Sequence, residues 1–270
     1  MSKELKIILI GVGNVGFHLG KKLHEVGLEV NQVYSRKITK AKRLSKIIKC
    51  EAIKNLEDIS KEADIYILAV PDSAIENVAA NLSKQIPLSK LVVHTSGATP
   101  STVLKPYFKN YGIFYPLQTF SITRKVNFSN IPICVDSNLK KHRASLEKLG
   151  RRISQSVHQI NDQERSILHI AAVFVNNFSN NLFTIGEKIT STEKLPFDLL
   201  KPLIQETVDK IIVQSPHEMQ TGPAKRGDNT TIQLHLKYLK KHFPEFIEVY
   251  QTMTQNINSK LSKIILRQKK

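Results

Sequence analysis

The first half of the chain alternates between short apolar runs and segments with helical spacing. Residues 7–10 are an unbroken apolar run, as in a strand that is covered on both faces. A helical pattern follows it over 17–26. Further strands are predicted at 29–34, 64–70, 91–94 and 131–135, and a strand followed by a turn at 112–120. Helices are predicted at 41–48, 73–84 and 138–149, the last ended by Gly150, and residues 152–157 close the domain. This alternation predicts a doubly wound, mostly parallel α/β sheet.

The pattern changes near residue 161, where long helical segments replace the alternation. The segment 163–190 is apolar almost all round, which predicts a buried central helix. An amphipathic helix is predicted over 197–213, and a last helix begins at Pro244 and runs over 245–266. We therefore expect a sheet domain over residues 1–158 and an all-helical domain over residues 159–270.

Three glycines join the first strand to the first helix in the pattern G-x-G-x-x-G. The first glycine allows the turn, the second lets a pyrophosphate approach the backbone, and the third lets the helix pack closely. The phosphates then lie at the positive end of the helix dipole. We expect a dinucleotide site formed by Gly11, Gly13, Asn14, Val15 and Gly16. The alternative is a glycine-rich turn that binds nothing.

The residues after the second strand bear on the choice of coenzyme. An acidic residue at this place binds the ribose 2′-hydroxyl of NAD, whereas an arginine accommodates the 2′-phosphate of NADP. This chain has Ser35, Arg36 and Lys37 there, and no acid. We therefore expect NADP as the cofactor. The alternative is that the two cations simply begin a basic helix.

Two further loops follow the carboxyl ends of predicted strands, where ligands bind in open α/β sheets. The first contains Val70, Pro71 and Ser73 and is expected to flank the ribose on the nicotinamide side, although a simple strand-to-helix turn would look the same. Ser73 or Asp72 can cap the helix that follows. The second loop contains Ser96 and Gly97, whose hydroxyl and N–H groups can hold a substrate carboxylate or carbonyl.

Polar residues inside the apolar central helix must be hydrogen-bonded or used in function. His169 lies about two helical turns before Asn176 and Asn177, which places the three residues near one face. Because histidine titrates near neutrality, we predict that His169 donates a proton to a carbonyl or imine and that Asn177 orients the substrate. Ser96 is the third catalytic candidate. The alternative for His169 is a hydrogen-bonded core residue, which is our interpretation of His94.

A loop over residues 221–228 precedes another predicted helix. Asp228 suits the N-cap position of that helix. Arg226 is placed to meet a substrate carboxylate or a phosphate. We therefore add Arg226 and Asp228 to the candidate substrate residues.

The chain carries 40 Lys and Arg against 23 Asp and Glu, a net charge of +17, so nucleic-acid and membrane partners must be considered. The lysines are spread over the whole chain without interleaved aromatic residues, and we expect no nucleic-acid partner. The early apolar run is far shorter than the roughly 20 residues that span a bilayer, so we expect a cytoplasmic protein. Cys50 and Cys134 lack metal-site spacing, and we expect two free thiols and no metal.

Together these motifs resemble the bacterial NADP oxidoreductases that join a Rossmann-like domain to a helical C-terminal domain of unknown function. Pyrroline-5-carboxylate reductase and the 6-phosphogluconate and 3-hydroxyacid dehydrogenases look like more distant kin. The resemblance rests on segments 11–16, 94–97, 115–120, 169–177 and 221–228. It implies a Rossmann sheet followed by a helical domain of the 6-phosphogluconate dehydrogenase-like type, and a homodimer built through the helical half.

The chain departs from these families at two places. The NADP oxidoreductases often have a histidine where this chain has Tyr115. The hydroxyacid dehydrogenases have a catalytic lysine four residues before an asparagine of the central helix, where this chain has Ala172 and Val173. Their acid–base mechanism therefore cannot be carried over, and His169 is the available substitute.

The function predicted from these observations is an NADP-dependent oxidoreductase that transfers hydride from NADPH to a small carbonyl or imine compound. Within that class we favour a small anionic substrate, a 2-keto acid similar to ketopantoate, because Arg36 and Arg226 suit anionic ligands. The alternatives are an NADP(H)-binding sensor or regulatory protein without turnover and, from the charge, a nucleic-acid-binding protein.

Overall fold

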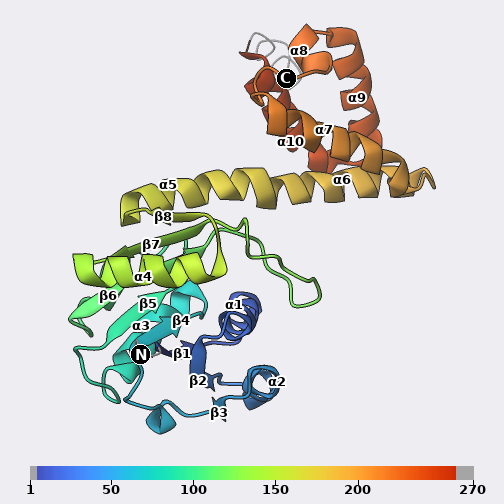
Figure 1. The fold of residues 1–270 in the computed structure, drawn as a ribbon. Helices are drawn as coiled ribbons and strands as arrows, with labels where there is room; N and C mark the ends of the chain where they lie inside the picture. The colour runs from blue at the N-terminus through green and yellow to red at the C-terminus, as the bar shows by residue number, and fades with distance from the viewer. Residues whose placement is uncertain (1–4, 260–270) are drawn as a thin grey trace. The chain divides into compact units, whose positions relative to one another are not determined.

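A mostly parallel sheet organises the first half of the computed structural model, which describes residues 5–259 (Figure 1). Its strands among the described residues are β1 (Lys6–Ile10), β2 (Glu29–Tyr34), β3 (Glu51–Ile53), β4 (Ile65–Leu68), β5 (Leu91–His94), β6 (Asn110–Pro116), β7 (Ile133–Ser137) and β8 (Val157–Gln159). They lie in the order β3-β2-β1-β4-β5-β6-β7-β8, and only the β6–β7 pair is antiparallel. The predicted doubly wound Rossmann sheet is confirmed.

Helices cover both faces of this sheet, which explains why β1 is apolar at successive positions. Neighbouring strand residues point to opposite faces. Ile7 and Leu9 therefore pack in one core cluster, and Ile8 and Ile10 in another. The first cluster includes residues of α1 (Asn14–Glu25), α2 (Ile38–Ile48) and α4 (Lys140–Ile153), and the second includes residues of α3 (Ile75–Leu82). The apolar run is thus a strand buried on both sides.

Several predicted boundaries were wrong. Helix α4 does not end at Gly150 but continues to Ile153, and the last strand, β8, begins at Val157. Gly150 serves close packing, because a Cβ there would lie 3.0 Å from Cγ1 of Val157. Neither Ser73 nor Asp72 caps the next helix, since α3 begins after a 3-10 turn and has no side-chain cap. The short strand β3 was not predicted.

The contacts between residues divide the chain into two units, 1–177 and 178–270. The division falls inside a continuous helical run made of α5 (Asp162–Ala172), a π-helical turn (Val173–Phe178) and α6 (Ser179–Thr192). The change of pattern near residue 161 follows the end of the last strand at Gln159, and the division by contacts lies within the helix that comes next.

Helices make up the second unit within the described residues. Besides α6, these are α7 (Lys201–Val213), α8 (Pro223–Arg226), α9 (Asn229–His242) and α10 (Ile247–Ile257). A small core forms around Ala224, Ile232 and Leu236. Asp228 is the N-cap of α9, as predicted, because its carboxylate accepts the N–H of Thr231. The part of the predicted last helix beyond residue 259 lies outside the described residues.

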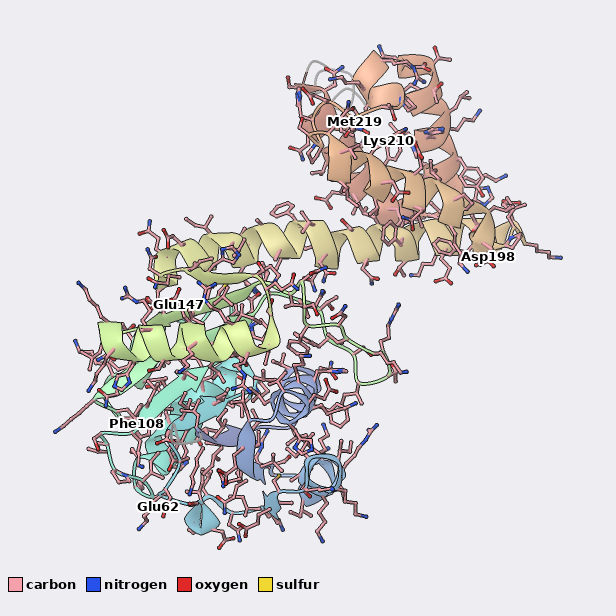
Figure 2. All side chains as sticks on the ribbon, viewed as in Figure 1. Glu62, Phe108, Glu147, Asp198, Lys210 and Met219 are labelled. Atoms are coloured by element: carbon pink, nitrogen blue, oxygen red, sulfur yellow. The ribbon has the colours of Figure 1, made fainter. Side chains whose placement is uncertain are left out.

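The helix that we expected to be buried exposes its apolar side chains in the single chain; Figure 2 draws the side chains on the ribbon. Ile167, Ile170 and Phe174 are 60%, 57% and 62% exposed. The buried residue of α5 is instead Arg165. The prediction that this helix is buried within its own chain was therefore wrong.

Residues 5–259 include no helix that combines the length and the hydrophobicity needed to cross a bilayer. Within the same range, no group of three or more His, Cys, Asp or Glu side chains is arranged to hold a metal ion. Cys50 and Cys134 are both free thiols.

Candidate functional site

The three motif glycines between β1 and α1 meet different surroundings. Gly11 has a φ of +103°, and a Cβ there would lie 2.3 Å from the carbonyl oxygen of Ala69. A Cβ on Gly16 would lie 2.1 Å from the carbonyl oxygen of Gly11. The chain's own packing therefore requires these two glycines. A Cβ on Gly13, by contrast, would meet no atom within 4 Å, so bare backbone faces open space there.

The start of α1 is suited to a phosphate group. Gly13 occupies the N-cap without a side-chain hydrogen bond, and the first turn contains no acidic residue. The first N–H groups of a helix have no partner within the helix, and they lie at the positive end of its dipole. A pyrophosphate would meet these donors together with the open backbone of Gly13. The residues present therefore fit a dinucleotide.

The turn after β2 presents two exposed cations. Ser35 is buried, and its hydroxyl oxygen accepts the N–H of Lys37 at 3.3 Å, which shapes the turn. Arg36 and Lys37 are exposed. Helix α2 then begins without a side-chain cap and without an acid in its first turn. The turn therefore suits the 2′-phosphate that distinguishes NADP from NAD.

The turn after β4 packs against the glycine turn. A Cβ on Gly11 would lie 2.8 Å from Cγ1 of Val70, so the two turns are in close contact. Pro71 and Ser73 follow and are exposed. The structure therefore brings together two of the loops that the sequence assigned to the coenzyme.

A cavity of about 540 Å³ lies within the first unit and brings predicted coenzyme residues and predicted catalytic residues together. Asn14 and Val15 of the glycine turn line it on one side. The helical run lines it with His169, Asn176 and Asn177. The rest of the lining comes from Tyr115, residues 117–120, Leu168, Ala171, Ala172, Val173 and Val175. Candidate coenzyme residues and the candidate catalytic pair thus share one cavity.

Asn176 and Asn177 lie in the π-helical turn rather than in regular α-helix. Our estimate of a shared face assumed about 3.6 residues per turn. A π-helical turn changes that register, and such turns occur often at functional sites. The cavity nevertheless contains both asparagines and His169.

Tyr115 and His169 form a close pair at the cavity. The Tyr115 hydroxyl lies 3.4 Å from Nδ1 of His169, and the rings meet edge to face. Gly97 lies against both, because a Cβ there would be 2.5 Å from Nδ1 of His169 and 2.9 Å from the Tyr115 hydroxyl. Burial raises the pKa of Tyr115, and the charge of Arg165 partly offsets this. The phenol therefore keeps its proton at neutral pH.

Ser96 and His94 shape the loop after β5. The Ser96 hydroxyl accepts the N–H groups of Ala98 and Thr99, and the Ser96 N–H donates to Nδ1 of His94 at 3.2 Å. His94 is fully buried, and burial, assisted by the charge of Arg165, lowers its pKa to about 4. His94 is thus a neutral core residue, as we interpreted it, and Ser96 has a structural task in the loop.

Arg226 and Asp228 belong to the second unit, and neither is among the residues that line this cavity. Both Asp228 oxygens accept hydrogen bonds from Thr231, one from its N–H and one from its hydroxyl, and these bonds lower the pKa of Asp228. The structure therefore gives Asp228 the role of a helix cap. Arg226 is exposed, and its predicted contact with a substrate stays a prediction.

Sequence reasoning missed three residues: Tyr115, which lines this cavity, and two residues of α5, the helix that carries His169. Tyr115 was noted only as a departure from the related families. Arg165 and Asp162, in the first turn of α5, were not singled out at all. Arg165 is fully buried and pairs with Asp162 at 2.7 Å. An arginine one helical turn before His169 was the available signal.

Comparison with known proteins covers nearly the whole chain. The Rossmann-like domain family matches residues 1–118, and the family described as domain of unknown function DUF2520 matches residues 131–257. No curated protein sequence matches the chain. A putative NADP oxidoreductase from Bacteroides fragilis is 33% identical in sequence, with 95% of this chain and 98% of that chain covered and a TM-score of 0.89.

Two further solved structures share the fold at lower identity. A protein from Thermotoga maritima is 21% identical, with a TM-score of 0.71 and coverage of 94% of this chain and 97% of that chain. An imine reductase from Myxococcus stipitatus in complex with NADP⁺ is 17% identical, with a TM-score of 0.65 and coverage of 96% and 94%. At these identities the likeness concerns the fold.

Proposed function

This chain belongs to the NADP oxidoreductase family represented by the Bacteroides fragilis structure, and we propose that it transfers hydride from NADPH to a small carbonyl or imine compound. One observation carries the proposal: the glycine turn and the Tyr115–His169 pair line the same cavity. A hydride donor held by that turn and a proton donor would therefore meet at one place.

NADP(H) is the coenzyme that the residues favour. The open backbone at Gly13 and the free start of α1 would hold the pyrophosphate. Arg36 and Lys37 would hold the 2′-phosphate. When bound, the nicotinamide supplies the hydride, and the protein's own residues bind, orient and protonate.

Reduction of a carbonyl or an imine also needs a proton, on oxygen or on nitrogen. His169 is the proposed donor, and the Tyr115 hydroxyl at 3.4 Å from Nδ1 is placed to orient the imidazole. Asn177, on the same cavity wall, would orient the substrate with its amide. A general acid of this kind contributes a rate factor of roughly 10² to 10⁴.

The lining of the cavity bears on the substrate. The first-unit residues that line it include no Lys, Arg, Asp or Glu. A carboxylate buried without a cation is costly. The lining therefore favours a substrate that is apolar apart from its reacting carbonyl or imine group and that carries no carboxylate. The small anionic 2-keto acid that the sequence favoured would need a cation that is not among these lining residues.

NADPH oxidation, followed by absorbance against a panel of cyclic imines, ketones and 2-keto acids, tests the proposal. His169→Ala should lower kcat about 100-fold with the best substrate, while the dissociation constant for NADPH changes less than about twofold. Tyr115→Phe should give a smaller loss. Unchanged turnover in His169→Ala removes the residue from the mechanism. Tight NADPH binding without turnover of any compound would instead support a sensor.

We also propose that the chain forms a homodimer through its helical half. The support is the set of exposed apolar side chains on α5 and α7, among them Ile167, Ile170, Leu203 and Ile212. Large exposed apolar patches usually mark interaction sites, and these side chains are the candidates to form one.

A further inference from the structure

The loop after β5 sets the space available to the reactive pair. Gly97 in this loop leaves no room for even a methyl group against His169 and Tyr115. His169 is carried by α5, whereas Tyr115 is carried by β6. A small movement between the loop and α5 would therefore alter the 3.4 Å approach of the Tyr115 hydroxyl to Nδ1 of His169.

A buried guanidinium joins this loop to α5. Arg165 is fully buried and donates to the carbonyl oxygen of Thr99 and to Oδ1 of Asp162. The other carboxylate oxygen of Asp162 accepts the N–H of Ser101 at 2.8 Å and the Ser101 hydroxyl at 2.9 Å. These hydrogen bonds pull the pKa of Asp162 below its usual range against the effect of burial. The carboxylate is therefore charged at neutral pH and pairs with Arg165.

The same turn of α5 is fixed at its start. The side chain of Asn161 accepts the N–H of Glu164, and the Glu164 carboxylate accepts the N–H of Asn161, which completes a capping box. Residues four apart in a helix lie on one face. His169 is therefore directly above Arg165 on the face that meets the loop.

We propose that Arg165 and Asp162 are positioning residues that clamp α5 to the loop after β5 and so hold His169 against Tyr115. This inference rests on the proposed role of that pair in proton donation. A buried ion pair stabilises a fold little more than apolar residues of the same volume would. Its directional hydrogen bonds, however, fix how the helix and the loop are aligned, which packing of apolar side chains would leave looser.

The test compares Arg165→Met, Arg165→Lys and Asp162→Asn with a matched control, Arg143→Met. Arg143 lies on α4, and its Nε is 2.9 Å from Oδ1 of Asp136, so the control also breaks an arginine–aspartate pair in the first unit. The readouts are kcat and KM with the best panel substrate, the NADPH dissociation constant, and the nuclear Overhauser effect between the ring protons of Tyr115 and His169.

Arg165→Met should lower kcat at least tenfold, while KM and NADPH affinity change less than threefold. It should also abolish the nuclear Overhauser effect between the rings of Tyr115 and His169. Arg165→Lys, which keeps the charge, should recover part of kcat, and Asp162→Asn should fall between the two. Arg143→Met should keep kcat within twofold and retain the ring contact. If Arg165 only stabilised the fold, Arg165→Met and Arg143→Met should lower kcat by similar factors. Arg165→Met should then also weaken NADPH binding.

The proposal is overturned if Arg165→Met keeps kcat within twofold of the unmodified chain and retains the ring contact. It is also overturned if Arg143→Met lowers kcat as much as Arg165→Met does. If no compound is turned over, the reductase proposal fails, and the ring contact in the same variants still decides the clamp. If Arg165→Met does not fold, the same criteria apply to Asp162→Asn and Arg165→Lys.

Discussion

Replacement of Gly13 separates the coenzyme site from the fold. Gly13 has φ −83° and ψ −163°, an extended conformation that any residue adopts, and a Cβ there would meet no atom within 4 Å. Gly13→Ala and Gly13→Val should therefore fold normally. Their side chains would occupy the space through which a pyrophosphate approaches the backbone.

The expected magnitudes follow from this geometry. Changing an N-cap glycine to alanine costs up to about 1 kcal/mol, which lowers Tm by about 2–4 °C in a protein of this size. Displacing the pyrophosphate forfeits at least one hydrogen bond to a charged group, about 1.5–3 kcal/mol, or roughly 10- to 100-fold in affinity. Gly16→Ala behaves differently. Its Cβ would lie 2.1 Å from the carbonyl oxygen of Gly11, so the fold itself should lose several kcal/mol.

The assay is NADPH fluorescence titration beside thermal unfolding of the same samples. We expect Gly13→Val to bind NADPH at least about tenfold more weakly at nearly unchanged Tm, with Gly13→Ala between it and the unmodified chain. We expect Gly16→Ala to lower Tm clearly, because its added Cβ destabilises the fold itself. NADPH affinity within twofold of normal in Gly13→Val would show that the pyrophosphate does not lie at this turn.

Three further predictions follow from the structure. Removing the cations of Arg36 and Lys37 by alanine substitution should weaken NADPH binding about tenfold or more and leave NADH binding unchanged in parallel titrations, since only NADPH carries the 2′-phosphate. Because the pKa of His94 is lowered to about 4 from 6.5, its contribution to stability is complete above pH 6.5 and is lost as the pH falls towards 4, by about 2 kcal/mol at pH 5; urea midpoints of His94→Gln should depend less on pH between 7 and 5 than those of the unmodified chain. Sedimentation equilibrium of the unmodified chain should give twice the chain mass, whereas Phe174→Glu should give the mass of one chain. Leu88→Glu is the control, at an exposed position outside α5 and α7, and should remain a dimer.

The sequence was sufficient for the coenzyme turn because every requirement there is local. The strand, the turn and the helix lie within 20 residues, and each glycine meets a constraint set by its neighbours or by a ligand. The placement of His169 and Asn177 on one cavity also followed from helical spacing, although the turn between them is π-helical. Which loop forms the opposite wall could not be read from spacing.

The residues that were missed depend on contacts between distant parts of the chain. In the sequence, Arg165 resembles a solvated charge in the first turn of a helix. In the structure its buried guanidinium donates to the carbonyl oxygen of Thr99, 66 residues earlier in the chain. Tyr115 meets His169 across 54 residues of sequence. Gly150 shows the reverse error, because a local rule for helix ends was overridden by packing against Val157.

Helix α5 shows that an apolar composition predicts burial but does not identify the surface that covers the apolar side chains. The face that meets its own unit carries buried Arg165 and half-buried His169, while exposed Ile167 and Ile170 lie elsewhere on the same helix. This is the reverse of an ordinary surface helix, whose apolar face meets the core. The polar face is explained by the clamp and the reactive pair on the inside. The apolar face stays exposed in the single chain, and the homodimer that we propose would cover it.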